Sequence, residues 1–208
     1  MTSSPAANTA AEEPRTAGRP LRADARRNRD LVLVAAATAF GEHGETASLE
    51  DIARHAGVGI GTVYRHFPSR AALLEAVYRH QVDQLYDAAS RLLETLPPDD
   101  ALREWCRLFV AYAATKKGWA GALKAALGPN AEVFASSRAR LLAALDSLID
   151  ANVQAGLMRS DISADDVLRA IGALCHSAET PDWQEATTRL AGLFLDGLRY
   201  GAPSTAAR

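Results

Sequence analysis

The stretch from Ser48 to Leu74 constrains the fold of this 208-residue chain more than any other part of it. Ser48 can cap a short helix, with Asp51 as its capping-box partner. Apolar residues then recur at helical spacing, at Leu49, Ile52, Ala53 and Ala56. Gly57 follows where the chain must turn, and glycine accepts a positive φ there at little steric cost. The spacing predicts a helix-turn-helix that leads into a longer third helix.

The second short helix of this unit has one apolar face and one mixed face. Val63 and Phe67 lie four residues apart, so we expect them to pack inward. The residues left on the outside are Ile60, Gly61, Thr62, Tyr64, Arg65 and His66. None is acidic, and short polar, aromatic and basic side chains beside a bare glycine backbone suit contact with bases and phosphates. The alternative is a surface helical hairpin that binds nothing.

Residues 31–78 resemble the DNA-binding domain of the TetR (tetracycline-repressor-like) family of bacterial transcriptional regulators. The matching positions are Leu33, Ala36, Phe40, Gly44, Leu49, Ile52, Ala53, Ala56 to Val58, Gly61 to Phe67, Ser69, Arg70, Leu73 and Leu74. The resemblance covers about a quarter of the chain. It implies an all-α dimeric regulator with an N-terminal helix-turn-helix domain and a C-terminal helical domain for ligand binding and dimerisation.

The resemblance also implies which residues contact DNA. Phosphate contacts are expected from Thr62, Tyr64, His66 and Arg70, and base contacts near Ile60, Gly61 and Arg65. The remaining members of the expected DNA-binding set are Ser48, Gly59, Arg26 and Arg27. Three positions depart from the family pattern: Gly59 replaces a capping serine, Arg70 replaces a lysine with a forked donor, and Glu45 stands where an aromatic residue is common.

Composition agrees with a helical protein that contacts DNA at one end. Apolar residues make up 48% of the chain, and long stretches with helical periodicity predict about nine helices. The net charge of −2 excludes a chain that is basic throughout. Arg15–Asp30 nevertheless holds six arginines and two acids, which suits either a DNA-contacting arm or a solvated tail.

Four segments are expected along the chain: a disordered arm over 1–20, the helix-turn-helix domain over 21–69, the ligand-binding and dimerisation domain over 70–201, and a loose tail over 202–208. The first helix is predicted from about Asp24 to His43. The last two helices, over about 163–178 and 182–200, carry small residues among large apolar ones. The resemblance implies that these helices form a homodimer, and dimers read palindromic sites.

Aromatic residues mark the expected small-molecule pocket. Trp105, Phe109 and Tyr112 share one face of a predicted helix, in the region where the resemblance places the ligand. The expected ligand-binding set adds Trp119, Phe134 and His176. A stripe of this kind is more often simple core packing, and the resemblance favours a pocket, so both interpretations stay open.

Nothing in the sequence predicts an enzyme, a cofactor or a metal site. The histidines are scattered, and Cys175-His176 lacks further ligands at a suitable spacing. Two distant cysteines and the lack of a run of about 20 apolar residues predict a cytoplasmic protein. The predicted function is a repressor released from a palindromic DNA operator by an unknown small-molecule effector. The alternatives are an activator with the same fold, and a helical small-molecule-binding protein or enzyme that does not bind DNA.

Overall fold

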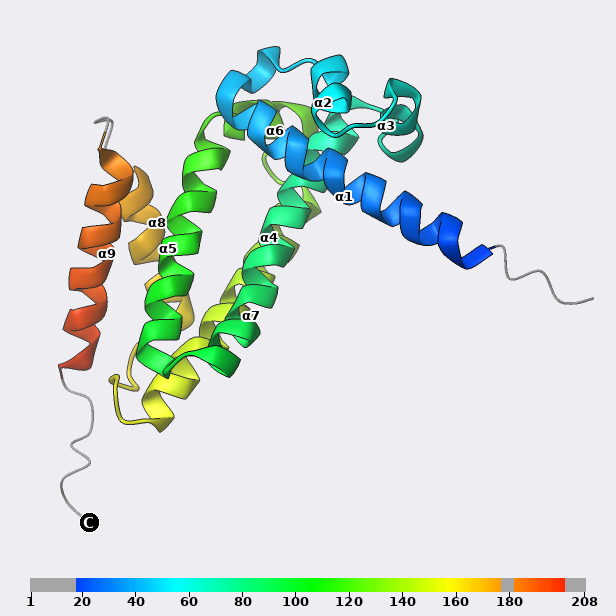
Figure 1. Cartoon of the computed structure of the whole chain (residues 1–208). Coiled ribbons are helices and arrows are strands. Elements are labelled where there is room, and N and C mark those ends of the chain that lie inside the picture. Colours follow the sequence, from blue (N-terminus) through cyan, green and yellow to red (C-terminus); the bar gives the residue numbers. More distant parts are fainter. Residues whose placement is uncertain (1–17, 177–181, 201–208) are drawn as a thin grey trace, which may run out of the picture.

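The computed structural model describes residues 18–176 and 182–200 (Figure 1). Over these ranges the chain forms nine α-helices and one short 3-10 helix, and no strand. The helices are α1 Gly18–His43, η1 Gly44–Thr46, α2 Leu49–His55, α3 Ile60–His66, α4 Arg70–Thr95, α5 Pro98–Lys117, α6 Ala120–Leu127, α7 Glu132–Gln154, α8 Ala164–His176 and α9 Trp183–Arg199. The predicted all-α fold is confirmed.

Local signals in the sequence set most of these boundaries. The hydroxyl oxygens of Ser48 and Ser69 each accept a hydrogen bond, from the Asp51 and Ala72 backbone N–H groups, both at 3.1 Å. Gly57, with φ 67°, provides the turn between α2 and α3. The helix-turn-helix is therefore built where the capping and turn residues place it.

Helix α1 begins earlier than expected. The prediction placed its start near Asp24, after a disordered arm, whereas α1 begins at Gly18. Pro20 falls in the first turn, where a missing N–H costs no intrahelical hydrogen bond. The leucine, arginines and alanines that follow favour a helix. Residues 1–17 and 201–208, where the rest of the arm and the tail were predicted, lie outside the described residues.

The helix-turn-helix lies at one end of the larger helical body (Figure 1). Helix α4 leaves it and packs against α7 and α5, while α8 and α9 lie on the far side of α5. The N-terminal half of α1 projects away from the rest of the molecule. One continuous cluster of buried side chains runs from Val63 in α3 to Leu148 in α7 and Ile171 in α8. The division into 21–69 and 70–201 therefore stays a prediction, because the two parts share a core.

Side chains from both parts meet at the junction between α1 and the α5–α6 turn. The ring of Phe40 lies 6.3 Å from the ring of Trp119, between centroids. Both side chains are buried. This contact fixes the end of α1 against the start of α6.

Candidate nucleic-acid interface and ligand pocket

Helix α3 packs with the face that the sequence predicted. Val63 is fully buried and Phe67 nearly so, whereas 48% of the Tyr64 surface is exposed. Gly59 is the N-cap residue in an extended conformation, and no side chain caps the helix. Val63 and Phe67 anchor this short helix in the core through its inner face. Its outer face is left exposed to a partner.

The outward side of α3 carries donors and no acid. Gly59, Gly61, Tyr64 and Arg65 are exposed, and Ile60, Thr62 and His66 are half-buried. The guanidinium of Arg65 makes no ion pair within the described residues. Asp51 of α2 is paired with Arg54 at 2.6 Å. Its charge is thus partly balanced on its own helix.

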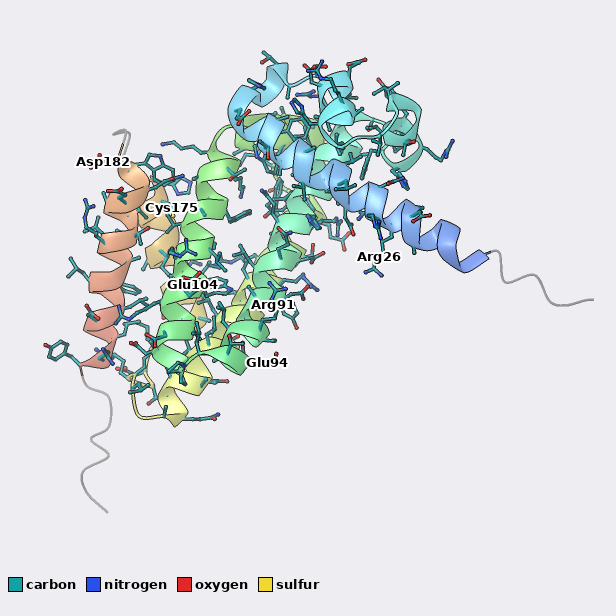
Figure 2. The ribbon with its side chains drawn as sticks, in the orientation of Figure 1. Arg26, Arg91, Glu94, Glu104, Cys175 and Asp182 are labelled. Carbon is teal, nitrogen blue, oxygen red and sulfur yellow. The ribbon has the colours of Figure 1, made fainter. Side chains whose placement is uncertain are left out.

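The other expected DNA contacts come from α1 and from the start of α2. The Ser48 hydroxyl caps α2 and donates to a Glu50 carboxylate oxygen at 3.2 Å, so a phosphate contact requires it to leave Glu50. Arg26 and Arg27 are exposed on α1. In Figure 2 the Arg26 side chain projects from α1 on the side opposite to α2 and α3. Any contact that it makes with DNA is separate from the α3 face.

Arg70 takes a different place from the one expected. Its Nη1 donates to the Ala47 carbonyl oxygen at 2.5 Å, and its Nη2 donates to the Gly44 carbonyl oxygen at 3.2 Å. The guanidinium also lies over the Phe40 ring, 5.0 Å from its centroid. The forked group spans the turn between α1 and α2, and the carbonyls face it from within the protein, so the expected phosphate contact stays a prediction that competes with these hydrogen bonds.

A partly open, mostly apolar pocket of about 250 Å³ lies between α5, α6 and α8, and we call it the α5–α6–α8 pocket. Three residues of the expected ligand-binding set line it, namely Phe109, Tyr112 and His176. Gly172 and Cys175 of α8 form part of its opposite wall. The helical spacing in α5 therefore predicted one wall of this pocket.

The other three residues of that set do not line this pocket, and a role for them in ligand binding stays a prediction. Trp105 is fully buried, stacks on Phe109 with centroids 5.7 Å apart, and donates its indole N–H to the Leu85 carbonyl oxygen at 2.8 Å. Trp119 packs at the junction with α1. Phe134 meets the Tyr78 ring edge-on at 5.6 Å. Large aromatic rings at these positions fill the space between packed helices, so they do not line a cavity.

Sequence reasoning missed Lys116, which lines the same pocket. Its ammonium lies 4.9 Å from the centroid of the Tyr78 ring and 5.7 Å from that of Tyr112. Burial lowers the pKa of Lys116, and the nearby charge of Lys124 lowers it further. The sequence suggested only that Lys116 ends a helix. The signal available was its spacing, four residues after Tyr112 and therefore on the same helix face.

The tyrosines around Lys116 form a buried polar chain. The Tyr112 hydroxyl is hydrogen-bonded to Tyr78, and Tyr78 is hydrogen-bonded to Ser137 of α7. Burial raises the pKa of both phenols, well above the ordinary value for Tyr112. Both tyrosines are therefore neutral at physiological pH and leave the charge of Lys116 uncompensated.

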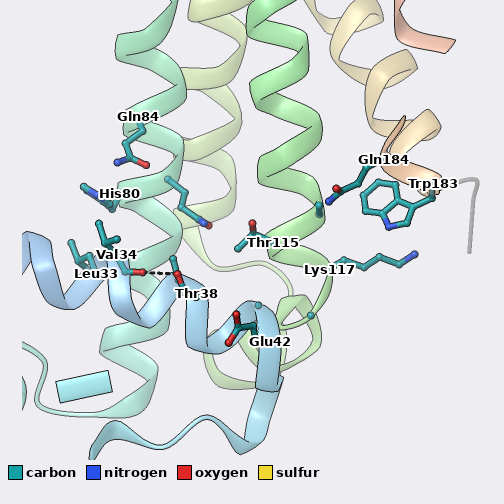
Figure 3. Close-up of a pocket in the computed structure, with 15 residues that line it drawn as sticks. Leu33, Val34, Thr38, Glu42, His80, Gln84, Thr115, Lys117, Trp183 and Gln184 are labelled. Atoms are coloured by element: carbon teal, nitrogen blue, oxygen red, sulfur yellow. Dashed lines mark hydrogen bonds between the residues drawn. The ribbon is translucent and has the colours of Figure 1, made fainter. Parts of the chain in front are cut away.

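A larger and more open groove, of about 690 Å³, lies at the junction of α1, α4, α5 and the start of α9 (Figure 3). Thr38, His80, Thr115 and Trp183 are among its lining residues. The His80 Nε2 atom is buried without a hydrogen-bond partner in the described structure. Because this groove is more open and more polar than the α5–α6–α8 pocket, it suits a ligand less well.

The described residues offer little support for redox or metal chemistry. Burial raises the pKa of Cys106 to about 12 and that of Cys175 to about 11, so neither thiol is activated. Within the described residues no group of three or more histidines, cysteines and acids is placed to hold a metal ion. The helices described are too short or too polar for any of them to cross a bilayer.

A short helix with an exposed face, joined through the long helix α4 to a helical body that holds a pocket, is the arrangement of helix-turn-helix transcriptional regulators. Residues 32–77 match the family described as bacterial regulatory proteins, tetR family. Residues 97–200 match the C-terminal domain of SbtR-like transcriptional regulators. The chain belongs to the TetR family of transcriptional regulators, which are DNA-binding proteins and not enzymes.

Solved structures agree over most of the chain. A TetR transcriptional regulator from Streptomyces coelicolor is 46% identical, with a TM-score of 0.77, over 82% of this chain and 98% of that one. A TetR regulatory protein from Mycobacterium vanbaalenii is 37% identical, with a TM-score of 0.69, over 86% of this chain and 99% of that one.

The curated relatives match about a third of the chain. The HTH-type transcriptional repressor LfrR from Mycolicibacterium smegmatis is 44% identical over 75 residues, which are 36% of this chain and 39% of LfrR. An HTH-type transcriptional regulator from Staphylococcus aureus is 39% identical over 70 residues, which are 33% of this chain and 37% of that protein. The matches thus span well under half the length of these two relatives.

Proposed function

We propose that the protein is a cytoplasmic homodimeric repressor that binds a palindromic operator through α3 and leaves it when a small molecule occupies the α5–α6–α8 pocket. The observation that carries the proposal is the exposed face of α3, with Tyr64 and Arg65 outward and Val63 buried behind them. A face that combines hydrogen-bond donors, an exposed glycine backbone and no acid suits contact with DNA, whereas a surface helix without a partner does not require this combination.

Each residue of the face has a proposed role in the major groove. Thr62, Tyr64 and His66 contact phosphates, and Arg65 and Ile60 lie nearest the base edges. Gly61 lets the backbone approach the duplex. The contacts from Ser48 and Gly59 flank this face, while Arg26 and Arg27 reach phosphates or the neighbouring minor groove.

The proposed dimer forms through α8 and α9, within the predicted ranges 163–178 and 182–200. Residues 177 and 178 lie outside the described residues. On α9, Leu190 and Leu193 expose 45% and 67% of their surfaces. A second copy would cover such apolar side chains, and its recognition helix would double a footprint that is small for one copy.

Release from DNA is proposed to start at the C-terminal end of α5. Phe109 and Tyr112 contact the ligand, with His176 of α8 on the other side. Displacement at this end tilts α4 and changes the distance between the two recognition helices. The ligand releases DNA only in so far as it binds the non-DNA-binding arrangement more tightly, which is a coupling of typically 1–3 kcal/mol. The relative LfrR, a named transcriptional repressor, supports the sign of regulation.

The repressor function is tested with the DNA upstream of the protein's own gene. Fluorescence anisotropy should detect specific binding, and a reporter driven by this DNA should rise in a deletion strain. Complementation with the wild-type chain should restore low output, and complementation with Arg65→Ala should not. A fall in reporter output on deletion would make the protein an activator, and no binding to any duplex would end the proposal.

The pocket is tested with a variant that narrows it. An ideal Cβ atom at Gly172 meets nothing within 4 Å, so Gly172→Leu fits the helix and extends into the space between α5 and α8. We expect this variant to bind operator as the wild type does but to be insensitive to the small molecules that release the wild type. Equal release of both proteins would place the ligand elsewhere.

A further inference from the structure

The charge of Lys116 has no counterpart in the described structure. The ammonium is flanked by two neutral tyrosine rings, at 4.9 and 5.7 Å from their centroids. No carboxylate of the described residues lies within ion-pair distance of it, although most other buried or half-buried cations here have such a partner, as Arg103 does in Asp99 at 3.0 Å. A half-buried ammonium without an ion pair lowers stability, because burial removes water molecules that would otherwise hydrate the charge.

The other described residues that line the pocket also provide no negative charge. Its lining residues include Lys116, Lys117 and His176, and none of the described ones is acidic. The remaining wall is apolar, with the rings of Phe109 and Tyr112 on α5 and Gly172 and Cys175 on α8. The volume of about 250 Å³ is just below the roughly 300–1,000 Å³ typical of drug-sized ligands, so the occupant is small.

We propose that the effector of the α5–α6–α8 pocket is a compact apolar monocarboxylate, whose carboxylate pairs with Lys116 and whose apolar part lies against Phe109 and Tyr112. The inference rests on the proposed function, since it names the chemical class of ligand for the same pocket. An anion supplies the ion pair that Lys116 lacks within the described residues, and the aromatic rings bury the rest of the molecule.

The simpler explanation is that cation–π contacts with Tyr78 and Tyr112 alone stabilise the ammonium of Lys116. Cation–π contacts contribute about 0.5–2 kcal/mol each, which offsets part of the desolvation cost. These contacts do not account for the position of Lys116 at the wall of a pocket, and Lys116 is one of the residues that line this one. An ion pair in this partly dry setting adds an attraction that is several times stronger than in water.

The experiment is isothermal titration of the full chain with two matched pairs of probes: octanoate and octanamide, and phenylacetate and phenylacetamide. We expect at least one acid to bind at least about tenfold more tightly than its amide, since one ion pair of about 1.4 kcal/mol net gives that ratio. Binding of neither acid, or equal binding of each acid and its amide, would overturn the proposal.

Variants at two lysines locate the charge. Lys116→Met should abolish the preference for the acid and leave amide binding unchanged, whereas Lys124→Met, at an exposed position of α6, should keep the preference. Lys116→Arg should also keep it, and this variant serves if the methionine variant does not fold. A preference that survives Lys116→Met would contradict the assignment.

A measurement of operator binding in the presence of each probe distinguishes failure of this proposal from failure of the proposed function on which it rests. If an acid binds at Lys116 and the operator complex is unaffected, the carboxylate site stands and ligand-gated repression fails. If only uncharged molecules release the operator, ligand-gated repression stands and the carboxylate site fails.

Discussion

The backbone of Gly118 lies so close to Gly41 that a Cβ atom at position 118 would be 2.6 Å from the Gly41 carbonyl oxygen. The same Cβ atom would be 3.3 Å from the carbonyl oxygen of Phe40. Gly118 directly follows Lys116 and Lys117, which line the α5–α6–α8 pocket. The last turn of α1 is therefore in backbone contact with the turn that ends the pocket helix. In the proposed mechanism, this contact would connect the pocket helix α5 with α1, which packs against α2 and α3.

Replacing Gly118 by alanine tests the closeness of this contact. Its φ of −66° and ψ of −20° suit any residue, so the cost of alanine is steric and not conformational. We expect Gly118→Ala to lower the free energy of unfolding by about 1–3 kcal/mol, as overpacking against rigid backbone does. Gly121→Ala in α6 is the matched control, because a Cβ atom there meets nothing within 4 Å. That change should stabilise the protein by about 0.5–1 kcal/mol. Urea denaturation measures both, and stabilisation by both alanines would contradict the close contact.

Arg70 should act on DNA binding only through the fold. Arg70→Ala removes the hydrogen bonds to the Gly44 and Ala47 carbonyl oxygens. We expect a loss of about 1.5–3 kcal/mol in the free energy of unfolding, the range for hydrogen bonds to charged groups. The slope of log affinity against log salt concentration for duplex DNA should stay unchanged. A slope reduced by about one would instead show that Arg70 neutralises a phosphate.

The dimer surface is tested at Leu193, which exposes 67% of its surface on α9. A carboxylate there would have to be desolvated in an interface, so Leu193→Asp should give monomers in sedimentation velocity and weak operator binding, with an unchanged circular dichroism spectrum. Ala139→Asp places the same charge on an exposed position of α7 and should leave the dimer intact. A wild-type chain that is monomeric at all concentrations would remove this interface.

The cysteines should be inert in the folded protein. Because burial raises the pKa values of Cys106 and Cys175 to about 12 and about 11, fewer thiolates form at mildly alkaline pH than in the unfolded chain. Iodoacetamide should label both thiols only after unfolding, as mass spectrometry would detect. The sign for stability follows from the raised pKa values. The unfolded chain loses thiol protons from the ordinary value of 9.0 upward, so the contribution is complete below pH 9.0 and declines as the pH rises toward 12. Fast labelling of native Cys106 would contradict its burial.

Features of the site that depend on near neighbours in the sequence were predictable. The inward pair Val63 and Phe67, the turn at Gly57 and the caps at Ser48 and Ser69 all follow from spacings of three or four residues. Helical spacing also placed Phe109 and Tyr112 on one wall of the pocket.

Features that depend on tertiary contacts were not predictable in this way. The partners of Arg70 lie 23 and 26 residues earlier in the chain, so its type and position suggested a phosphate contact instead. Trp119 was assigned to the ligand because it is aromatic, but Phe40 of α1 is its neighbour. Lys116 was overlooked because a basic residue at the end of a helix is already explained by the helix dipole.

The central claim is that the outward face of α3 is what holds the DNA, and two arginines test it most directly. Arg65 lies on that face, and Arg91 is exposed on α4 in the body, as Figure 2 shows. Operator affinity is measured by fluorescence anisotropy for the wild type, Arg65→Ala and Arg91→Ala at one salt concentration. We predict a loss of about 1–3 kcal/mol for Arg65→Ala, which is roughly 5- to 150-fold, and an affinity within about twofold of the wild type for Arg91→Ala. Equal affinities for the two variants would contradict the account.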